Sequence, residues 1–314
     1  MTPIDLFIRL NDKPYPIREH SFEFWNSWVD NNIILEIKSI SEKIKSWFYL
    51  KKIKNENDRD RMENEELMTS LIFLEYAKKV KDPRKTFDYY QKKERINSRV
   101  GDKSYISSLL LQISESEGQS REFWINSFKS IKSFINKLKI VLLDRNVNEN
   151  DLAQYLSEEL DQILKAGGKT LYHRRTMQDF YFMWQILADL NLDMVKLNRL
   201  EMKKDLKSLF FYIKNIPESD WENNQGVKNY DILVDDFKRK YAISERKLKL
   251  NSQDVKDLLS KQGGVSSISS ALIFEGDEIE IDHIHPIAKG GPDDISNMAI
   301  VHKDENRTKG SKLS

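Results

Sequence analysis

The sequence predicts a mainly α-helical protein, with a helical bundle over residues 1–240 and a small module of two strands and one helix over residues 241–314. Two observations predict this organisation. Apolar residues recur at helical spacing through most of residues 18–241, where glycine and proline are scarce. Seven of the eleven glycines follow residue 225, and from Glu275 onward apolar and charged residues alternate with the period of a strand. The change in pattern marks the boundary between a helical domain and a smaller domain of another class.

Helices in the first domain are predicted by apolar residues three or four positions apart. The first pattern runs through Phe22, Trp25, Val29 and Ile33, and the next through Ile37, Ile40 and Ile44. Residues 51–65 carry many charges without an apolar face, so we expect an exposed linker there. Further helices are predicted over residues 123–143, 152–164, 177–190 and 194–213.

The composition excludes several classes of protein. No apolar run approaches the ~20 residues that a membrane-spanning helix needs, and the N-terminal residues do not resemble a signal peptide. Cysteine is absent, which excludes disulfides and cysteine-based zinc sites and favours a cytoplasmic protein. The net charge is +1, so any binding of nucleic acid has to use local basic patches rather than a global positive charge.

The C-terminal residues predict a strand, a loop, a second strand and a short helix. Ile279 and Ile281 alternate with acidic residues, which is typical of a half-buried strand. Residues 288–296 are dense in glycine, proline and aspartate and predict a loop, while residues 298–301 form a short apolar run. Asp304 is a suitable N-cap for a helix that ends at Gly310.

Residues with catalytic chemistry are concentrated in this module, which contains three of the five histidines of the chain. Hydrolysis of a phosphodiester needs a base for the attacking water and a cation that neutralises charge on the phosphate. His283 is the expected base, because imidazole titrates near neutral pH. Asp282 and Asn306 offer the oxygen ligands that Mg²⁺, or Mn²⁺ in its place, prefers.

Other side chains are expected to support this chemistry. Asn297 is expected to hydrogen-bond the backbone near His283 and so to hold the imidazole in orientation. Arg307 and Lys309 flank the second asparagine and are expected to contact the phosphate backbone. His285 follows two residues later on the same strand face, where it is either a further phosphate-binding residue or a hydrogen-bonded structural histidine.

These residues together resemble a known family. The pattern consists of Asp-His-Ile-x-Pro from Asp282, Gly290-Gly291, Asn297, and Asn-Arg-x-Lys-Gly from Asn306. It resembles the HNH endonucleases, whose core is a ββα-metal fold, over residues 255–312. The resemblance implies that Asp282 and Asn306 bind the divalent ion, that His283 is the general base and that Asn297 orients the loop. It thereby implies a metal-dependent endonuclease that acts on DNA.

The sequence departs from the family in one respect. Many HNH domains carry two cysteine pairs that bind a structural zinc, and the matching positions here are Ser266, Ser269, His302 and Glu305. Serine is a poor zinc ligand, so we predict no structural zinc. We expect the module to be stabilised instead by apolar packing that involves Leu258, Leu259, Leu272 and Ile273.

The N-terminal residues carry a second resemblance. Leu6-Phe7-Ile8-Arg9-Leu10-Asn11, followed by Tyr15-Pro16-Ile17 and a long helix, is similar to the segment that closes the first domain of GmrSD-type restriction proteins. In that family a ParB-like nucleotide-hydrolysing domain precedes a helical region and often an HNH-type nuclease. The likeness implies a role in restriction or antiviral defence, with a ParB-like first domain that is missing or lies on another polypeptide.

Two alternatives stay open for the function. In the first, the module is a non-catalytic HNH-like fold that binds DNA or a partner protein. In the second, it is a nuclease subunit that is active only within a larger complex. One site per chain would need two copies for a concerted double-strand break, which suggests a homodimer.

A basic and aromatic cluster in the helical domain also allows two interpretations. Tyr172-His173-Arg174-Arg175 either contacts nucleic acid through stacking and charge, or serves the fold by pairing with Asp179 or capping a helix. The sequence alone does not decide between a binding role and a structural role for these residues.

Overall fold

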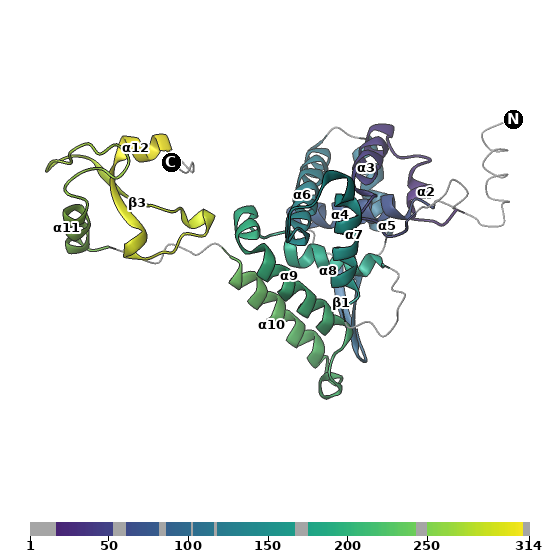
Figure 1. Ribbon diagram of the computed structural model, residues 1–314. Helices are drawn as coiled ribbons and strands as arrows, with labels where there is room; N and C mark the ends of the chain where they lie inside the picture. The colour runs from purple at the N-terminus through teal and green to yellow at the C-terminus, as the bar shows by residue number, and fades with distance from the viewer. Residues whose placement is uncertain are drawn as a thin grey trace. The chain divides into compact units, whose positions relative to one another are not determined.

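The computed structural model describes residues 17–52, 61–81, 86–101, 103–115, 118–166, 175–242 and 250–309. Contacts divide the chain into two compact units (Figure 1). The first comprises Met1–Asp189 with Arg199–Phe237, and the second comprises Leu190–Asn198 with Lys238–Ser314. The predicted domain boundary at 240/241 stays a prediction. None of the helices in the described ranges is long and apolar enough to cross a membrane.

Helices build most of the first unit, and the mainly helical fold class is confirmed. They are α2 (Phe22–Trp25), α3 (Asn31–Ile44), α4 (Glu63–Lys79), α5 (Ser104–Glu115), α6 (Gln119–Leu142), α7 (Glu149–Leu164), α8 (Met177–Leu187), α9 (Leu192–Lys214), the 3₁₀ turn η1 (Glu218–Asp220) and α10 (Gln225–Lys240). The start of α9, up to Asn198, and the end of α10, from Lys238, belong to the second unit. Helix α4 packs against α3 and α6 and is buried continuously from Glu66 to Ala77. A helix that is buried on every side forms the centre of a domain, and α4 has this place in the first unit.

The apolar pattern over residues 22–33 forms two helices rather than one. Helix α3 starts after Asp30, whose carboxylate accepts hydrogen bonds from the backbone N–H groups of Asn32 and Ile33 at 2.9 and 3.4 Å. Aspartate stabilises the start of a helix by satisfying these otherwise unpaired donors. The capping residue therefore interrupts a pattern that spacing alone predicts to be continuous.

The predicted linker over residues 51–65 is shorter than expected, because α4 begins at Glu63. The side-chain oxygen of Asn64 accepts hydrogen bonds from the backbone N–H groups of Leu50 and Lys51 at 2.7 and 3.2 Å. These bonds fix the chain on both sides of residues 53–60, which lie outside the described ranges.

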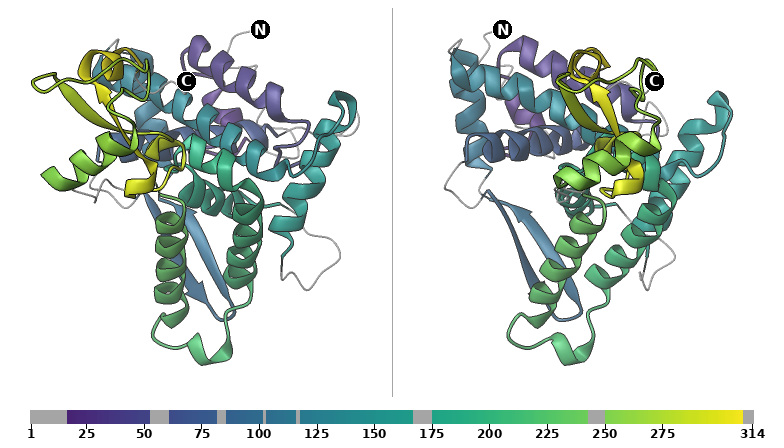
Figure 2. Two further views of the ribbon diagram at one scale, coloured as in Figure 1. Left: turned by 60° about the vertical axis from the view of Figure 1, so that its left-hand side comes forward. Right: turned by 90° about the vertical axis from the view of Figure 1, so that its left-hand side faces the viewer.

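A β-hairpin in the first unit was not predicted. Strands β1 (Phe87–Lys92) and β2 (Arg95–Val100) pair in antiparallel register and lie beside α10 (Figure 2). The side chain of Gln91 accepts a hydrogen bond from the backbone N–H of Gly226 at 3.0 Å. The Tyr89 hydroxyl donates to Asp231 on α10. The hairpin is thus held by side-chain contacts with a helix that is distant in the sequence.

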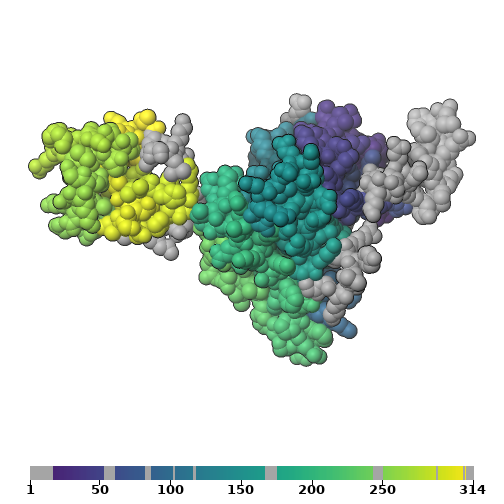
Figure 3. All heavy atoms as spheres, viewed as in Figure 1, coloured from purple at the N-terminus to yellow at the C-terminus, as the bar shows by residue number. Residues whose placement is uncertain are grey.

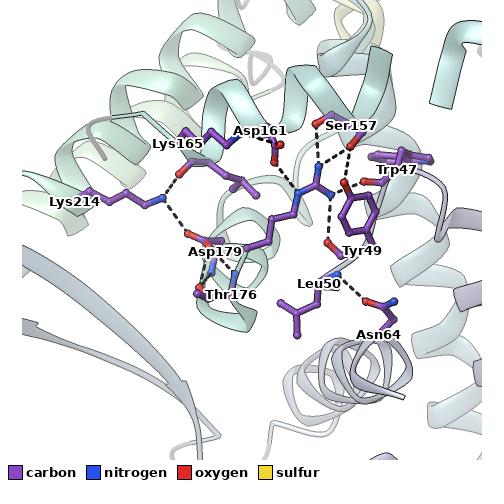
Figure 4. A network of polar contacts seen from close by, with 12 residues as sticks. Trp47, Tyr49, Leu50, Asn64, Ser157, Asp161, Lys165, Thr176, Asp179 and Lys214 are labelled. Carbon is purple, nitrogen blue, oxygen red and sulfur yellow. Dashed lines mark hydrogen bonds and ion pairs between the residues drawn. The ribbon is translucent and has the colours of Figure 1, made fainter. Parts of the chain in front are cut away.

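Arg175 has a structural role in the first unit, at the end of the cluster that allowed two interpretations. Figure 4 labels the residues that accept its hydrogen bonds, Trp47, Tyr49, Ser157 and Asp161. Its side chain is 3% exposed, and its Nε donates to Asp161 at 2.8 Å. Its Nη1 donates to the carbonyls of Trp47 and Tyr49 at 2.7 and 3.2 Å. Its Nη2 donates to the carbonyl and the hydroxyl of Ser157, both at 2.9 Å. All five N–H groups of a guanidinium can be satisfied by these acceptors.

Among the described residues, Asp179 forms an ion pair with Lys214, and Arg175 forms one with Asp161. The Lys214 ammonium lies 3.2 Å from the Asp179 carboxylate, and burial lowers the pKa of this lysine. Asp179 also completes a capping box with Thr176 at the start of α8. Residues 172–174 of the cluster lie outside the described ranges.

The second unit contains the predicted strand, loop, strand and helix (Figure 1), and Figure 3 draws the heavy atoms of its C-terminal residues in light green to yellow. Its elements are α11 (Ser252–Lys261), β3 (Ile279–His283), the 3₁₀ turns η2 (Ile287–Lys289) and η3 (Ile295–Asn297), β4 (Met298–His302) and α12 (Lys303–Lys309). Strands β3 and β4 are antiparallel, with Ile281 opposite Ile300. Helix α12 begins at Lys303, so Asp304 lies in its first turn and is not the N-cap that the sequence predicted.

The core of the second unit lies between α11 and one face of the two strands. Leu258, Met298 and Ile300 are buried there, and the partly buried side chains around them are Leu250, Val255, Leu259, Ile273, Ile279 and Ile281. The predicted contributions of Leu258, Leu259 and Ile273 are confirmed. That of Leu272 is wrong, because its side chain is 60% exposed while its backbone forms a β-bridge with Val265.

Candidate functional site

The two faces of strand β3 have different roles. Ile279 and Ile281 belong to the apolar core, so alternation along the strand directs Glu280 and Asp282 to the opposite face. Glu280 contacts Asn306 on α12, which places this helix on the acidic face. The strand therefore presents two carboxylates toward α12 while its other face stabilises the unit.

Asn306 is held in one orientation by an acidic neighbour. Its Nδ2 donates a hydrogen bond to Glu280 Oε2 at 2.8 Å. Because a carboxylate only accepts hydrogen bonds, the amide nitrogen must face Glu280 and the amide oxygen must face away from it. The side chain of Asn306 is half-buried and contacts the strand face that Glu280 shares with Asp282 by alternation.

His283 is the last residue of β3 and is almost completely enclosed. Its side chain is 4% exposed, and its Nε2 lies 3.0 Å from Oδ1 of Asp293 in the loop between the strands. The Asp293 side chain is 9% exposed. The structure therefore places the predicted base in a buried contact with a carboxylate that the sequence did not identify.

Asn297 fixes the loop that follows His283. Its side chain is buried, its Oδ1 accepts from the His285 backbone N–H at 2.9 Å, and its Nδ2 donates to the carbonyls of His285 and Pro292 at 2.9 and 2.8 Å. The carbonyl of Asn297 accepts from the N–H of Ile284 at 2.8 Å. These bonds reach the backbone next to His283, where the sequence predicted an orienting asparagine.

Two glycines allow the same loop to close tightly. Gly290 has a φ of 88°, a left-handed conformation that favours glycine. A Cβ atom on Gly291 would lie 1.9 Å from the carbonyl oxygen of His285, which no other residue tolerates. The Gly-Gly pair is therefore required for the backbone approach that Asn297 stabilises.

His285 lies beyond the end of β3, so the prediction that it shares a strand face with His283 is wrong. Its exposed ring contacts the carbonyl of Lys289 through Nε2 at 3.1 Å. This contact supports the structural interpretation and leaves the predicted phosphate contact untested. The side chains of Arg307 and Lys309 lie outside the described part of the structure, and their roles stay predictions.

The four positions that match zinc ligands in other HNH domains lie close together. Ser266 is buried, and its hydroxyl donates to Glu305 Oε2 at 2.5 Å. Hydrogen bonds from the Ser266 and Ser269 hydroxyls lower the pKa of Glu305, and the charge of nearby His302 acts in the same direction. Hydrogen bonds around a carboxylate thus join α12 to the segment before β3.

The acidic face of β3 fits a divalent cation with few protein ligands. Across the described ranges, no group of three histidine or carboxylate side chains is arranged to hold a metal ion. Asp282 and the amide oxygen of Asn306 would supply two oxygens, and Mg²⁺ commonly takes the remainder from substrate phosphate and water. The donor set therefore fits a hard, oxygen-binding ion better than zinc.

Two residues of the site were missed in the sequence. Glu280 carries a signal, because it stands two positions before Asp282 and shares its strand face. Asp293 carries none, because Pro292-Asp293-Asp294 is typical of any turn. In the structure Asp294 caps η3 through the N–H groups of Ser296 and Asn297, whereas Asp293 turns toward His283.

Comparison with known proteins agrees with this geometry. Residues 269–312 match the family model described as HNH endonuclease. No curated protein and no solved structure gives a significant match to the chain. The resemblance to GmrSD-type proteins stays a prediction, and residues 6–16, on which it mostly depends, lie outside the described ranges. The predicted family of the C-terminal module is confirmed: residues 269–312 carry the sequence pattern of the HNH endonucleases, a family of nucleases.

Proposed function

We propose that the C-terminal module is a metal-dependent endonuclease that hydrolyses DNA phosphodiester bonds. The observation that carries this proposal is the contact between Asn306 on α12 and the face of β3 that bears Asp282. That contact brings the amide and the carboxylate to one side of the module, one residue away from the predicted base. The HNH match over residues 269–312 supports the same reaction.

Each residue has a separate role in the proposed reaction. His283 accepts a proton from the water that attacks phosphorus. Asp282 and Asn306 hold Mg²⁺ or Mn²⁺, and a bound divalent ion supplies positive charge that stabilises the developing negative charge on the phosphate. Asn297 keeps the loop beside His283 in place. Arg307 and Lys309 hold the phosphate backbone, as the sequence predicted.

The arrangement limits how DNA can lie on the module. By strand alternation Asp282 belongs to the same face as Glu280, which contacts α12, whereas His283 stands at the strand end and contacts Asp293 in the loop. Because adjacent strand residues point to opposite sides, both can reach one phosphate only if the backbone crosses the end of β3. We therefore propose that the scissile phosphate lies across this end of the strand.

The test is nicking of supercoiled plasmid by the full chain, with Mg²⁺, with Mn²⁺ and with EDTA. We expect relaxed plasmid with either metal and no product with EDTA. We expect the nicking rate of His283→Ala to be lower by about 100-fold or more, since general-base catalysis contributes ~10²–10⁴-fold. His302→Ala is the matched control, because it removes a histidine of the same module that has no role in the proposed chemistry.

Two results would contradict the proposal. Nicking by His283→Ala at the wild-type rate would exclude this residue as the base. Plasmid binding without nicking, under every metal condition, would support the non-catalytic alternative instead. A role in restriction or antiviral defence, a ParB-like partner and a homodimer stay predictions. Nicking of modified and unmodified DNA, with and without nucleotide, would test the first two, and the oligomeric state in solution would test the third.

A further inference from the structure

We infer that Asp293 is a positioning residue of the nuclease: its carboxylate fixes the His283 ring so that Nδ1 is the nitrogen that faces substrate water. The inference rests on the proposed function, in which His283 is the base. It adds a residue that the HNH match and the motif do not specify.

The contact determines where the proton of a neutral His283 lies. Asp293 Oδ1 is 3.0 Å from Nε2, a normal hydrogen-bond distance. A carboxylate is an acceptor only, so Nε2 must carry the proton and donate it. The tautomer of a histidine is set by the hydrogen bond of one nitrogen, which leaves the other available. The lone pair is therefore on Nδ1.

Nδ1 is accessible although the residue is buried. Three fully buried side-chain atoms lack a hydrogen-bond partner in the described part of the chain: the indole nitrogens of Trp28 and Trp124, and one oxygen of Glu66. His283 Nδ1 is not among them, and the described residues supply no hydrogen bond to it. This nitrogen consequently keeps some contact with solvent, as a base that activates water requires.

The loop holds Asp293 in a fixed place. Asp293 stands between Pro292, whose carbonyl accepts from Asn297, and Asp294, which caps the following turn. The neighbouring Gly291 N–H donates to the carbonyl of Pro286 at 3.1 Å. Backbone that is pinned on both sides positions a side chain more accurately than a free loop does. The pair is thus built into the fold.

The first test measures the proton on His283 without any cleavage. The full chain is labelled with ¹⁵N-histidine, and the five histidines are resolved by NMR, with His283→Ala identifying the relevant signals. In the wild type at a pH where His283 is neutral, we expect a protonated Nε2 and an unprotonated Nδ1. In Asp293→Asn we expect both tautomers, because an amide can accept or donate.

The second test separates catalysis from binding. Single-turnover cleavage at saturating DNA should slow about 10- to 100-fold in Asp293→Asn, part of the ~10²–10⁴-fold that a general base supplies. Affinity for the same DNA should be unchanged, and Asp293→Glu should recover part of the rate. Asp257→Asn is the matched control, because it removes the same charge from an exposed side chain on α11 that takes no part in the loop.

Different failures have different meanings. A neutral His283 that carries its proton on Nδ1 in the wild type overturns the inference. So does an Asp293→Asn variant that cleaves at the wild-type rate while His283→Ala is inactive, and the proposed function then survives. If the wild type never cleaves DNA, the proposed function is wrong. The contact between Asp293 and His283 would then have no catalytic role, even where NMR detects it.

Discussion

Arg175 in the first unit and His283 in the second are both enclosed polar side chains, but they use their hydrogen-bonding groups differently. Arg175 directs five hydrogen bonds to four residues and has no N–H group left. His283 uses Nε2 for Asp293 and leaves Nδ1 accessible, and Asn306 uses Nδ2 for Glu280 and leaves its oxygen. Arg175 and His283 are buried to a similar extent, but only Arg175 uses all of its hydrogen-bonding groups.

The difference separates a structural role from a functional one. A buried polar group without a partner costs about 1–3 kcal/mol, and a bound substrate, ion or water can remove that cost. Every N–H group of Arg175 has an acceptor, and these hydrogen bonds hold α7 against the segment after α3. The proposed reaction needs the two atoms that these side chains leave unbonded, Nδ1 of His283 and the amide oxygen of Asn306.

The largest expected effect is the loss of the Arg175 network. Arg175→Met removes the donors for the carbonyls of Trp47, Tyr49 and Ser157, so we expect the free energy of unfolding to fall by about 3 kcal/mol or more. Arg99→Met is the matched control, because Arg99 forms an exposed ion pair with Asp88, and such pairs contribute about 0–1 kcal/mol. Denaturant unfolding of the full chain measures both. If Arg175→Met and Arg99→Met lowered the free energy of unfolding equally, a complete set of hydrogen bonds would not distinguish structural residues.

The second effect concerns the metal rather than the fold. Asn306→Ala removes the proposed amide ligand, and Glu280→Ala removes only the residue that orients it. We expect both variants to need more Mg²⁺ for half-maximal nicking, with a shift of about 10- to 100-fold for Glu280→Ala, the usual cost of losing a residue that orients a ligand. Thermal unfolding should change little. Unaltered Mg²⁺ dependence in both variants would contradict the proposed ligand set.

The residues of the site differ in how far the sequence predicted them. Asp282, His283, Asn297 and Asn306 follow from motif spacing, because strand, loop and helix lengths fix their relative positions. Asp293 does not, since either aspartate of a Pro-Asp-Asp turn can cap η3, and only the folded loop shows which one turns toward His283. A sequence pattern gives backbone positions, whereas the direction of a loop side chain depends on its neighbours.

The fold shows the same limit. Helical periodicity predicted α6, α7 and α9 closely, because long amphipathic patterns leave few alternatives. The β1–β2 hairpin was missed, because it depends on Gln91 and Tyr89 meeting α10 more than a hundred residues later. The start of α3 after Asp30 was not predicted for a different reason. Apolar residues at helical spacing continue on both sides of this N-cap, so the pattern alone does not show that one helix ends and another begins there.

A third, smaller effect tests the loop that carries Asp293. Asn297→Ala removes three side-chain hydrogen bonds, one of them from the His285 backbone N–H. We expect the second unit to lose about 1–3 kcal/mol, because the backbone groups of His285 and Pro292 lose their hydrogen bonds to Asn297. Hydrogen exchange at the His285 amide should accelerate accordingly. Ser296→Ala, an exposed neighbour, is the control, and equal exchange in the two variants would contradict the role of Asn297.

The smallest expected effect is a change in acid stability at Glu305. The Ser266 and Ser269 hydroxyls lower the pKa of this carboxyl from its ordinary value of 4.5. A lowered pKa in the folded state means that the stabilisation is fully present above the ordinary value and is lost as the pH falls through the lowered one. Glu305→Gln should therefore flatten the loss of stability on acidification below about pH 4.5.

The comparison variant is Glu275→Gln, which neutralises an exposed carboxylate of the same unit. Thermal unfolding of both variants and the wild type across the acidic range gives the three slopes. A Glu305→Gln slope equal to that of Glu275→Gln would show that the serine hydroxyls do not stabilise the ionised carboxylate. A flatter slope for Glu305→Gln alone would show that a hydrogen-bonded carboxylate joins α12 to the segment before β3, at the positions where related domains bind zinc.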